Sequence, residues 1–276
     1  MKAYLKKIRT DKAFLFGNII ILIVLTFSLF GKYIAPYPFD GMDTRILLQK
    51  PSFLHWFGTD TFGRDIFSRI ILGTWIAVKT SLIITSISLT IGVTLGIISG
   101  FVGGIVDSSI NFLIGVIMCI PSLFLTLGII SILGPSLENV IISMALVSWT
   151  GVARMSRSKT QSIKNQQFVE AARAFGENNF SIMLRYILPN ILPFIVFLMT
   201  ISIPSSLLMS AGLGFLGLGA QPPSPDWGLI LADGMANMYI APYMAIYPGV
   251  MLTLTILGMN LFGEGIRDLL DPKLQK

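Results

Sequence analysis

The sequence contains little cysteine, histidine or charge. One cysteine, Cys119, and one histidine, His55, occur among its 276 residues. A single cysteine cannot form a disulfide within the chain, and one histidine with one cysteine cannot complete a closed His/Cys metal site. Charged residues make up only 12% of the chain, whereas soluble domains usually carry about 25%. These shortages exclude a disulfide framework and a His/Cys metal centre within this chain, and they disfavour a water-soluble fold.

Long apolar runs take the place of the missing charge. Hydrophobic residues form 53% of the chain, its mean hydropathy is +0.76, and a helix needs about 20 apolar residues to cross a bilayer. Six segments have or approach that length, namely residues 14–35, 76–99, 105–133, 137–153, 190–214 and 243–262. The sequence therefore predicts an all-α integral membrane protein with about six transmembrane helices, in which Pro121 and either Pro193 or Pro204 can introduce kinks.

Lysine and arginine are distributed unevenly between the predicted loops. Of the 20 basic residues, five lie in residues 1–13, six in 154–189 and three in 263–276, and the other six lie on the opposite side. Cytoplasmic loops carry the excess of Lys and Arg, so both termini are predicted to be cytoplasmic in a bacterial cell membrane. The same rule explains the net charge of +6 better than nucleic-acid binding, because no basic stripe with interleaved aromatics occurs.

These spans and this orientation divide the chain into parts. The first apolar run exceeds a signal-peptide core of about 7–15 residues and no small-residue cleavage site follows it, so we interpret it as a retained helix. The predicted parts are a cytoplasmic segment 1–13, a first transmembrane helix 14–35, an external loop 36–75, a five-helix core 76–262 with a cytoplasmic loop 154–189 and an external loop 215–242, and a cytoplasmic tail 263–276.

Two patterns typical of nucleotide-binding proteins are incomplete or misplaced. Residues 212–217 match G-x-G-x-x-G, but they end an apolar helix without a βαβ unit, so a glycine-rich helix end is the better interpretation. Residues 73–80 resemble a phosphate-binding loop, but Val78 occupies the position of the second glycine. The chain therefore has no visible ATPase motif or catalytic residue, and we do not expect it to be an enzyme.

No charged residue lies near the centre of a predicted transmembrane helix. Asp107, Glu138 and Glu264 lie near helix ends, where a solvated role is the better interpretation. Proton relays and coupling-ion sites normally need ionisable groups within the membrane. A secondary transporter or channel is therefore a distant alternative, and a membrane scaffold is a third.

Small residues recur every four positions in the predicted second helix. They are Ser88, Gly92, Gly96, Gly100 and Gly104. At this spacing they form one smooth ridge against which another helix can pack closely. We interpret the ridge, and Gly92, Gly96 and Gly100 in particular, as a helix-packing surface.

The predicted cytoplasmic loop 154–189 is long for a connection, which indicates a function or helices of its own. Its pattern predicts short helices over residues 154–165, 168–175 and 179–188. Gly176 suits the end of one helix, and the pair Asn178-Asn179 suits the start of the next. Such a hairpin could dock with a soluble partner, and an ordinary solvated basic loop is the alternative.

Within this loop, the stretch Glu170-Ala171-Ala172-Arg173-Ala174-Phe175-Gly176, followed by Leu188-Pro189, resembles the EAA motif of ABC importer permeases. Three residues before Pro189, the family usually has isoleucine, and this chain has Tyr186. In that family the motif forms a coupling helix that sits in a groove of the ATPase subunit. The resemblance therefore implies ATPase-coupling roles for Glu170, Ala171, Ala172, Gly176, Leu188 and Pro189.

Three further blocks narrow this likeness. They are H-W-F-G-T-D with G-R-D in residues 55–65, F-L-G-L-G-A-Q-P-P in residues 215–223, and N-L-F-G-E-G-I-R-D in residues 260–268. Together they are similar to the second, C-type permease subunit of the dipeptide, oligopeptide and nickel importers. Two departures lie on or near the expected pathway. Phe112 and Gly115 take the places of the usual Arg and Asp before Pro121, and the usual Arg-Ile-Ser-Leu-like run after Gly73 is Trp75-Ile76-Ala77-Val78.

The resemblance implies a type I ABC importer permease fold and a set of partners. These would be a second homologous permease, two ATP-binding subunits that hold ATP and Mg²⁺, an extracytoplasmic substrate-binding protein, and membrane lipid. The chain itself would need no cofactor or metal. Peptides are the first expected substrate, with nickel or a metal chelate as the alternative, and no residue is assigned to substrate binding.

The uneven distribution of basic residues predicts the labelling of introduced cysteines in a chain whose Cys119 is replaced by serine. A cysteine within residues 154–189 should be protected from membrane-impermeant reagents in intact cells, because that loop is predicted to be cytoplasmic. A cysteine within residues 40–50 should be labelled. The reverse pattern would contradict the orientation.

Overall fold

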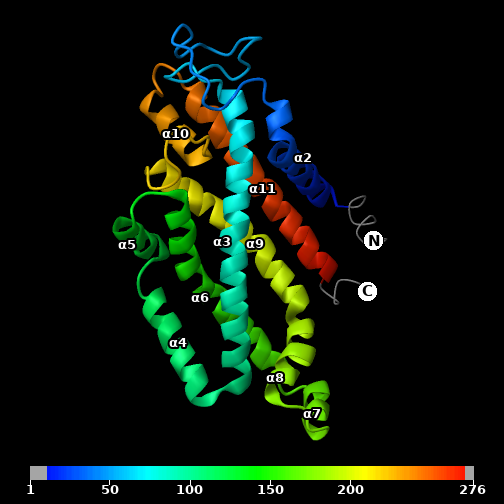
Figure 1. Cartoon of the computed structure of the whole chain (residues 1–276). Helices are drawn as coiled ribbons and strands as arrows, with labels where there is room; N and C mark the ends of the chain where they lie inside the picture. The colour runs from blue at the N-terminus through cyan, green and yellow to red at the C-terminus, as the bar shows by residue number, and fades with distance from the viewer. Residues whose placement is uncertain (1–10, 271–276) are drawn as a thin grey trace. The chain divides into compact units, whose positions relative to one another are not determined.

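The protein folds almost wholly into helices, as predicted. A computed structural model describes residues 11–270, and within them no strand forms beyond an isolated bridge between Thr59 and Asp65. Figure 1 traces the helices in order: α2 (Lys12–Ile34), α3 (Ile66–Val102), α4 (Gly104–Met118), α5 (Ser122–Leu133), α6 (Leu137–Ile163), α7 (Gln167–Ala174), α8 (Asn179–Ile182), the π-helical turn η1 (Met183–Ile187), α9 (Leu188–Phe215), α10 (Trp227–Ala236) and α11 (Tyr243–Leu270).

Four helices of the described chain are long and apolar enough to cross a membrane. They are α2, α3, the continuous helix Asn179–Phe215 and α11. The bent pair of α4 and α5 makes a fifth if it counts as one span. The fourth predicted span forms α6, but the polar residues at its two ends leave its apolar part too short to meet the same criterion.

The predicted bend at Pro121 is confirmed. Helices α4 and α5 meet at 82° across the break between Met118 and Ser122. Proline has no N–H to donate to the preceding turn, so the helix ends there. By contrast, α9 continues through both Pro193 and Pro204.

Three predicted boundaries are corrected. Helix α3 begins at Ile66, ten residues before the predicted start at 76, because Asp65 accepts a hydrogen bond from the Ser68 N–H at 2.8 Å and caps the helix. The loop predicted over 36–75 is therefore shorter.

The second and third corrections concern the loop predicted over 154–189. Residues 154–163 are the end of α6 and not a separate helix. The helix predicted over 179–188 continues through η1 into α9, and Pro189 follows that π-helical turn. Between α6 and α8, only α7 and its flanking turns remain as a connection. In the loop predicted over 215–242, α10 forms.

The chain divides into two compact units. Among the described residues, one holds 11–83, 130–141 and 200–270, and the other holds 84–129 and 142–199. In the first, α2 lies along α11, as Figure 1 shows. Their contact includes the Phe14 and Phe262 rings, whose centroids lie 5.9 Å apart.

The second unit contains the glycine ridge of α3, which packs against α6. A Cβ atom at Gly92 would lie 2.7 Å from the Trp149 carbonyl oxygen, and one at Gly96 would lie 2.6 Å from the Ala153 carbonyl oxygen. Gly100 likewise lies against Arg157. Real side-chain atoms do not approach so closely, so these three positions accept only glycine without a shift of the backbone. The fifth position of the ridge, Gly104, has open space around it and takes no part in this contact.

Gly96→Leu should separate α3 from α6. Overpacking a tight site costs about 1–3 kcal/mol, and here the obstructing atoms belong to the backbone of α6. The thermal unfolding midpoint of the purified protein and its yield in membranes should both fall. Leu95→Ile, a volume-conserving change one residue away, should leave both nearly unchanged. Normal stability of Gly96→Leu would contradict the packing role of the ridge.

Candidate functional site

The turn after α7 is a complete Schellman motif. Gly176 adopts φ +80°, its N–H donates to the Arg173 carbonyl at 3.0 Å, and the Glu177 N–H donates to the Ala172 carbonyl at 3.1 Å. Two carbonyls at the helix end are thereby satisfied. Asn178 then caps α8, because its side-chain oxygen accepts a hydrogen bond from the Ser181 N–H at 2.8 Å. Both predicted capping positions are confirmed, and they make a defined hairpin.

One face of α7 is locked into the core of the second unit. Val169 is fully buried and Ala172 is only 3% exposed. They belong to a cluster of buried residues drawn from several helices, which includes Phe101 of α3, Ile163 of α6, Ile182 of α8, Ile187 of η1, and Ile191 and Leu198 of α9. The hairpin is therefore not a solvated loop but part of a helical core.

Polar contacts add to this attachment. The Arg173 guanidinium lies over the Phe101 ring, 5.4 Å from its centroid, and Arg185 pairs with Glu177 at 3.7 Å. The first contact joins α7 to α3, and the second joins the connection between α7 and α8 to η1.

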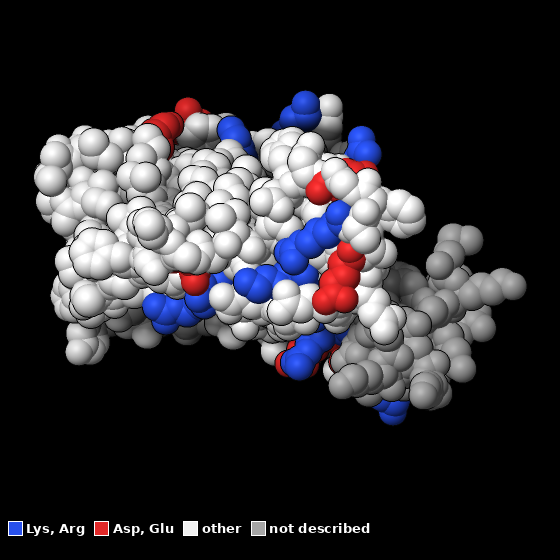
Figure 2. Space-filling view, turned by 90° about the horizontal axis from the view of Figure 1, so that it is seen from below, with Lys and Arg blue, Asp and Glu red and all other residues white. Residues whose placement is uncertain are grey.

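The opposite face of the hairpin is open. Glu170 and Ala171 are exposed, and Phe175 is 89% and Phe180 67% exposed. These two apolar side chains lie on the face of the hairpin that its own chain leaves uncovered, so this face is available to a partner. On the face seen from below, Lys and Arg side chains lie close to Asp and Glu side chains (Figure 2).

The structure divides the six residues assigned to this site. Glu170, Ala171 and Gly176 lie on the exposed side, and Pro189 is exposed at the start of α9 while Leu188 is half-buried. Ala172 was expected to face a partner, but it is buried in the core of its own chain because it lies three positions from Val169 on the same face of α7. Phe175 and Phe180 were not among the predicted site residues. The sequence did offer a signal for them, because each is a large apolar residue beside a glycine or asparagine that ends or starts a helix.

A polar network beside the glycine ridge was also missed. Arg157 of α6 donates from Nε and Nη2 to the two carboxylate oxygens of Asp107 in α4, each at 2.6 Å. Ser99 and Asn111 also donate to Asp107. The prediction that Asp107 is a solvated helix-end group is therefore wrong, since a bidentate Arg–carboxylate pair fixes α4 to α6.

A second polar cluster lies in the first unit, between α2 and the start of α3. Arg64 donates to Asp60 at 2.6 Å, and His55 lies 2.9 Å from Asp65. Arg69 is 1% exposed and donates to the carbonyls of Phe39, Pro223 and Ser224. The block at residues 55–69 thus makes a buried scaffold that joins two distant loops.

The loop that precedes α10 is anchored to the same scaffold. The Trp227 indole N–H donates to the Ile70 carbonyl at 2.9 Å. Asp226 caps α10 by accepting from the Leu229 N–H at 3.1 Å, and burial raises the pKa of this carboxyl. Gly217, at φ +76°, ends α9 with another Schellman motif, which confirms that the G-x-G-x-x-G pattern is a helix end.

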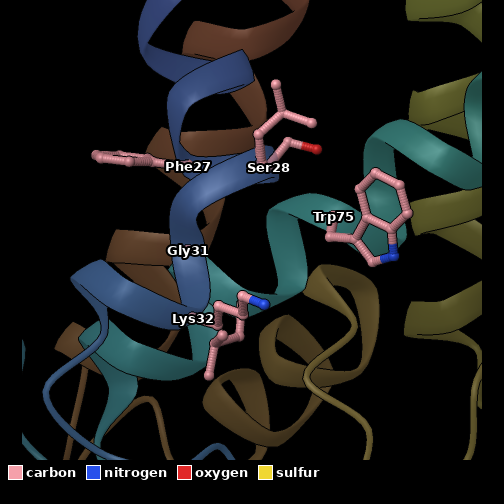
Figure 3. Close-up of a pocket in the computed structure, with 7 residues that line it drawn as sticks. Phe27, Ser28, Gly31, Lys32 and Trp75 are labelled. Carbon is pink, nitrogen blue, oxygen red and sulfur yellow. The ribbon is translucent and has the colours of Figure 1, made fainter.

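Three cavities open along the exposed side of Trp75 in α3. One, of about 350 Å³, is lined by α2 and α3, and includes Ser28 and Lys32 (Figure 3). A second, of about 290 Å³, includes Lys79 and Glu138, and a third, of about 460 Å³, includes Gln221. Within the described residues, no group of three or more His, Cys, Asp or Glu is placed to hold a metal ion.

Comparison with known proteins gives this arrangement a context. The family described as "Binding-protein-dependent transport system inner membrane component" matches residues 92–276. The family described as "N-terminal TM domain of oligopeptide transport permease C" matches residues 2–51. The first of these matches includes the whole hairpin.

Individual relatives agree along almost the entire chain. The glutathione transport system permease protein GsiD of Escherichia coli O6:K15:H31 (strain 536 / UPEC) is 38% identical over 271 residues, which cover 98% of this chain and 89% of the relative. The GsiD protein of Shigella flexneri serotype 5b (strain 8401) is 40% identical over the same length.

A solved structure shares the fold. An inward-facing structure of the MetNI methionine ABC transporter aligns with a TM-score of 0.61 at 21% identity, covering 75% of this chain and 98% of the other. At that identity the likeness concerns the fold alone.

Asp107→Asn should loosen the joint between α4 and α6. Hydrogen bonds to charged groups contribute about 1.5–3 kcal/mol, and the side chains of Arg157 and Asp107 are only 27% and 18% exposed, so the thermal unfolding midpoint should fall measurably. Arg157→Gln should give a similar loss, and the double variant should cost less than the sum of the two. Full additivity in this double-mutant cycle would show that the pair contributes nothing to stability.

Proposed function

The chain belongs to the family of binding-protein-dependent transport system inner membrane components, and we propose that it forms half of the pathway by which an ABC importer carries short peptides across the membrane. It is a permease subunit of the C-type within the peptide and nickel importer family. Peptide transport is supported by relatives named for glutathione, which is a tripeptide. Nothing in these relatives supports nickel or a metal chelate as the cargo.

The partners follow from the same family. The second half of the pathway would come from a homologous permease, the energy from two ATP-binding subunits, and the substrate from an extracytoplasmic binding protein. This chain would contribute no enzymatic step. The excess of basic residues in 1–13, 154–189 and 263–276 supports a cytoplasmic location for the hairpin and both termini.

The main support for the proposal is the α7–α8 hairpin, which has one exposed face and one face packed into a core. Its outer face, with Ala171, Phe175 and Phe180, would lie against an ATP-binding subunit. Its inner face is packed against residues of α3, α6 and α9. A displacement of α7 would therefore move these three helices together, because a close-packed core transmits strain rather than absorbing it.

The capping geometry makes this lever rigid. The Schellman motif at Gly176 and the cap at Asn178 satisfy the backbone groups at both helix ends, so the turn resists bending. ATP binding and hydrolysis in the partner subunits would close and reopen their interface, and α7 would pass that movement to the pathway.

Gly176→Val tests the coupling role. A β-branched residue at φ +80° costs about 1–3 kcal/mol of strain, so the turn should change conformation while the protein stays in the membrane. Glutathione uptake by cells that carry the complete importer should be abolished. Copurification of the ATP-binding subunit should weaken, and the affinity of the binding protein for glutathione should stay unchanged.

Gly176→Asn is the matched control. Asparagine tolerates the left-handed conformation, and a Cβ atom at this position meets no other atom within 4 Å. It should therefore retain most of the uptake. Normal uptake and copurification in Gly176→Val would remove the main support for the coupling assignment.

A further inference from the structure

Trp75 lies at the centre of an uncovered face of α3. Its side chain is 49% exposed, and it lines all three cavities described above. In Figure 3 it projects from α3, while Lys32 comes from α2. The rest of the first unit leaves this side of the helix open.

The cavity of about 290 Å³ differs from the other two because it contains one cation and one anion. Lys79 projects from α3, one turn after Trp75, and Glu138 from the first turn of α6. Both are exposed, and within the described part of the chain neither forms an ion pair. The cavity wall between them is mainly apolar, with Ile76, Ile83, Leu137 and Ile141.

Lipid is an unsuitable neighbour for this face. Lys79 lies in the helix Ile66–Val102, which is long and apolar enough to cross a membrane, and a lysine that faces hydrocarbon costs about 2.5–3.5 kcal/mol at the centre of a span. Charged groups within spans normally face a water-filled cavity and mark a substrate pathway. Two opposite charges on one cavity favour an occupant with complementary charges.

Short peptides with free ends carry such complementary charges. We propose that the Lys79–Glu138 cavity is a transit site for the termini of a zwitterionic peptide. The Lys79 ammonium receives the carboxylate of the peptide and the Glu138 carboxylate receives its α-ammonium group. This inference rests on the proposed function and names the feature of the substrate that the permease recognises.

The cavities around Lys79 and Glu138 suit a site that recognises the two ends of a peptide more than its side chains. Trp75 and Ile76 also line the adjoining cavity of about 460 Å³, together with Gln221, Pro223 and Pro225. The larger, adjoining cavity gives room for peptide side chains of varied size next to the charged pair. The Lys79–Glu138 cavity, at about 290 Å³, is close to the lower end of the ~300–1,000 Å³ range of small-molecule sites.

The test measures uptake of radiolabelled glycylglycine, its N-acetyl form and its C-terminal amide by cells that carry the complete importer. Lys79→Gln and Glu138→Gln should each lower uptake of glycylglycine at low concentration by about ten- to a hundredfold, because a charged hydrogen bond contributes about 1.5–3 kcal/mol and each 1.4 kcal/mol is a factor of ten. The amount of each variant in the membrane should stay unchanged, since both side chains are exposed.

The modified peptides separate recognition from a structural role. Glu138→Gln should reduce the preference for glycylglycine over its N-acetyl form, and Lys79→Gln should reduce the preference over the amide. A preference that arises only in the binding protein would not change in either variant. Lys32→Gln is the matched control, because Lys32 lines a cavity that contains no acidic side chain, and its uptake should remain normal.

Three outcomes would overturn the proposal. Normal uptake by both variants would show that the charges are merely solvated. Unchanged preferences despite reduced uptake would exclude recognition of the termini. Loss of the copurifying second permease would show that the charges pair with that subunit instead. If the unaltered importer took up no peptide, the proposed function itself would fail, which is distinguishable from failure in the variants alone.

Discussion

The close approach of α3 to α6 is the contact on which the second unit depends. Hydrocarbon chains are as apolar as leucine, so helices in a membrane associate through tight packing rather than through the hydrophobic effect. Gly92, Gly96 and Gly100 remove the side chains that would hold the two backbones apart. Beside this contact, Arg157 reaches Asp107 and ties α4 to the same pair. The residues that follow on α6 lead directly to the hairpin.

In the proposed function, the hairpin would pass movement from a partner into this packing. A solvated loop would absorb a push from a partner, whereas α7 is held on its inner side by a core drawn from several helices. Its outer side exposes the apolar side chains of Phe175 and Phe180. In the proposed function, an energy source outside the chain would drive transport, and the permease would need only rigidity at this point and an uncovered pathway face elsewhere.

The first unit uses polar contacts for a different purpose. Arg69 is buried, and carbonyls from two separate loops satisfy its donors. Burying the Arg69 guanidinium without those partners would cost several kcal/mol. The fold therefore keeps the two loops beside Arg69. In contrast, Lys79 and Glu138 keep their charges free in a cavity, which suits groups that exchange partners during transport.

The sequence by itself determined the helical membrane fold, the bend at Pro121, the packing ridge and the caps of the hairpin, because each depends on the composition or spacing of neighbouring residues. It placed the limits of α3 and α6 less well, since polar residues can extend a helix beyond its apolar part. Only the tertiary structure decided that Ala172 turns inward, that Asp107 pairs with Arg157, and that Lys79 shares a cavity with Glu138. These residues are brought together by the packing of separate helices, and no local spacing in a single sequence specifies which of them will meet.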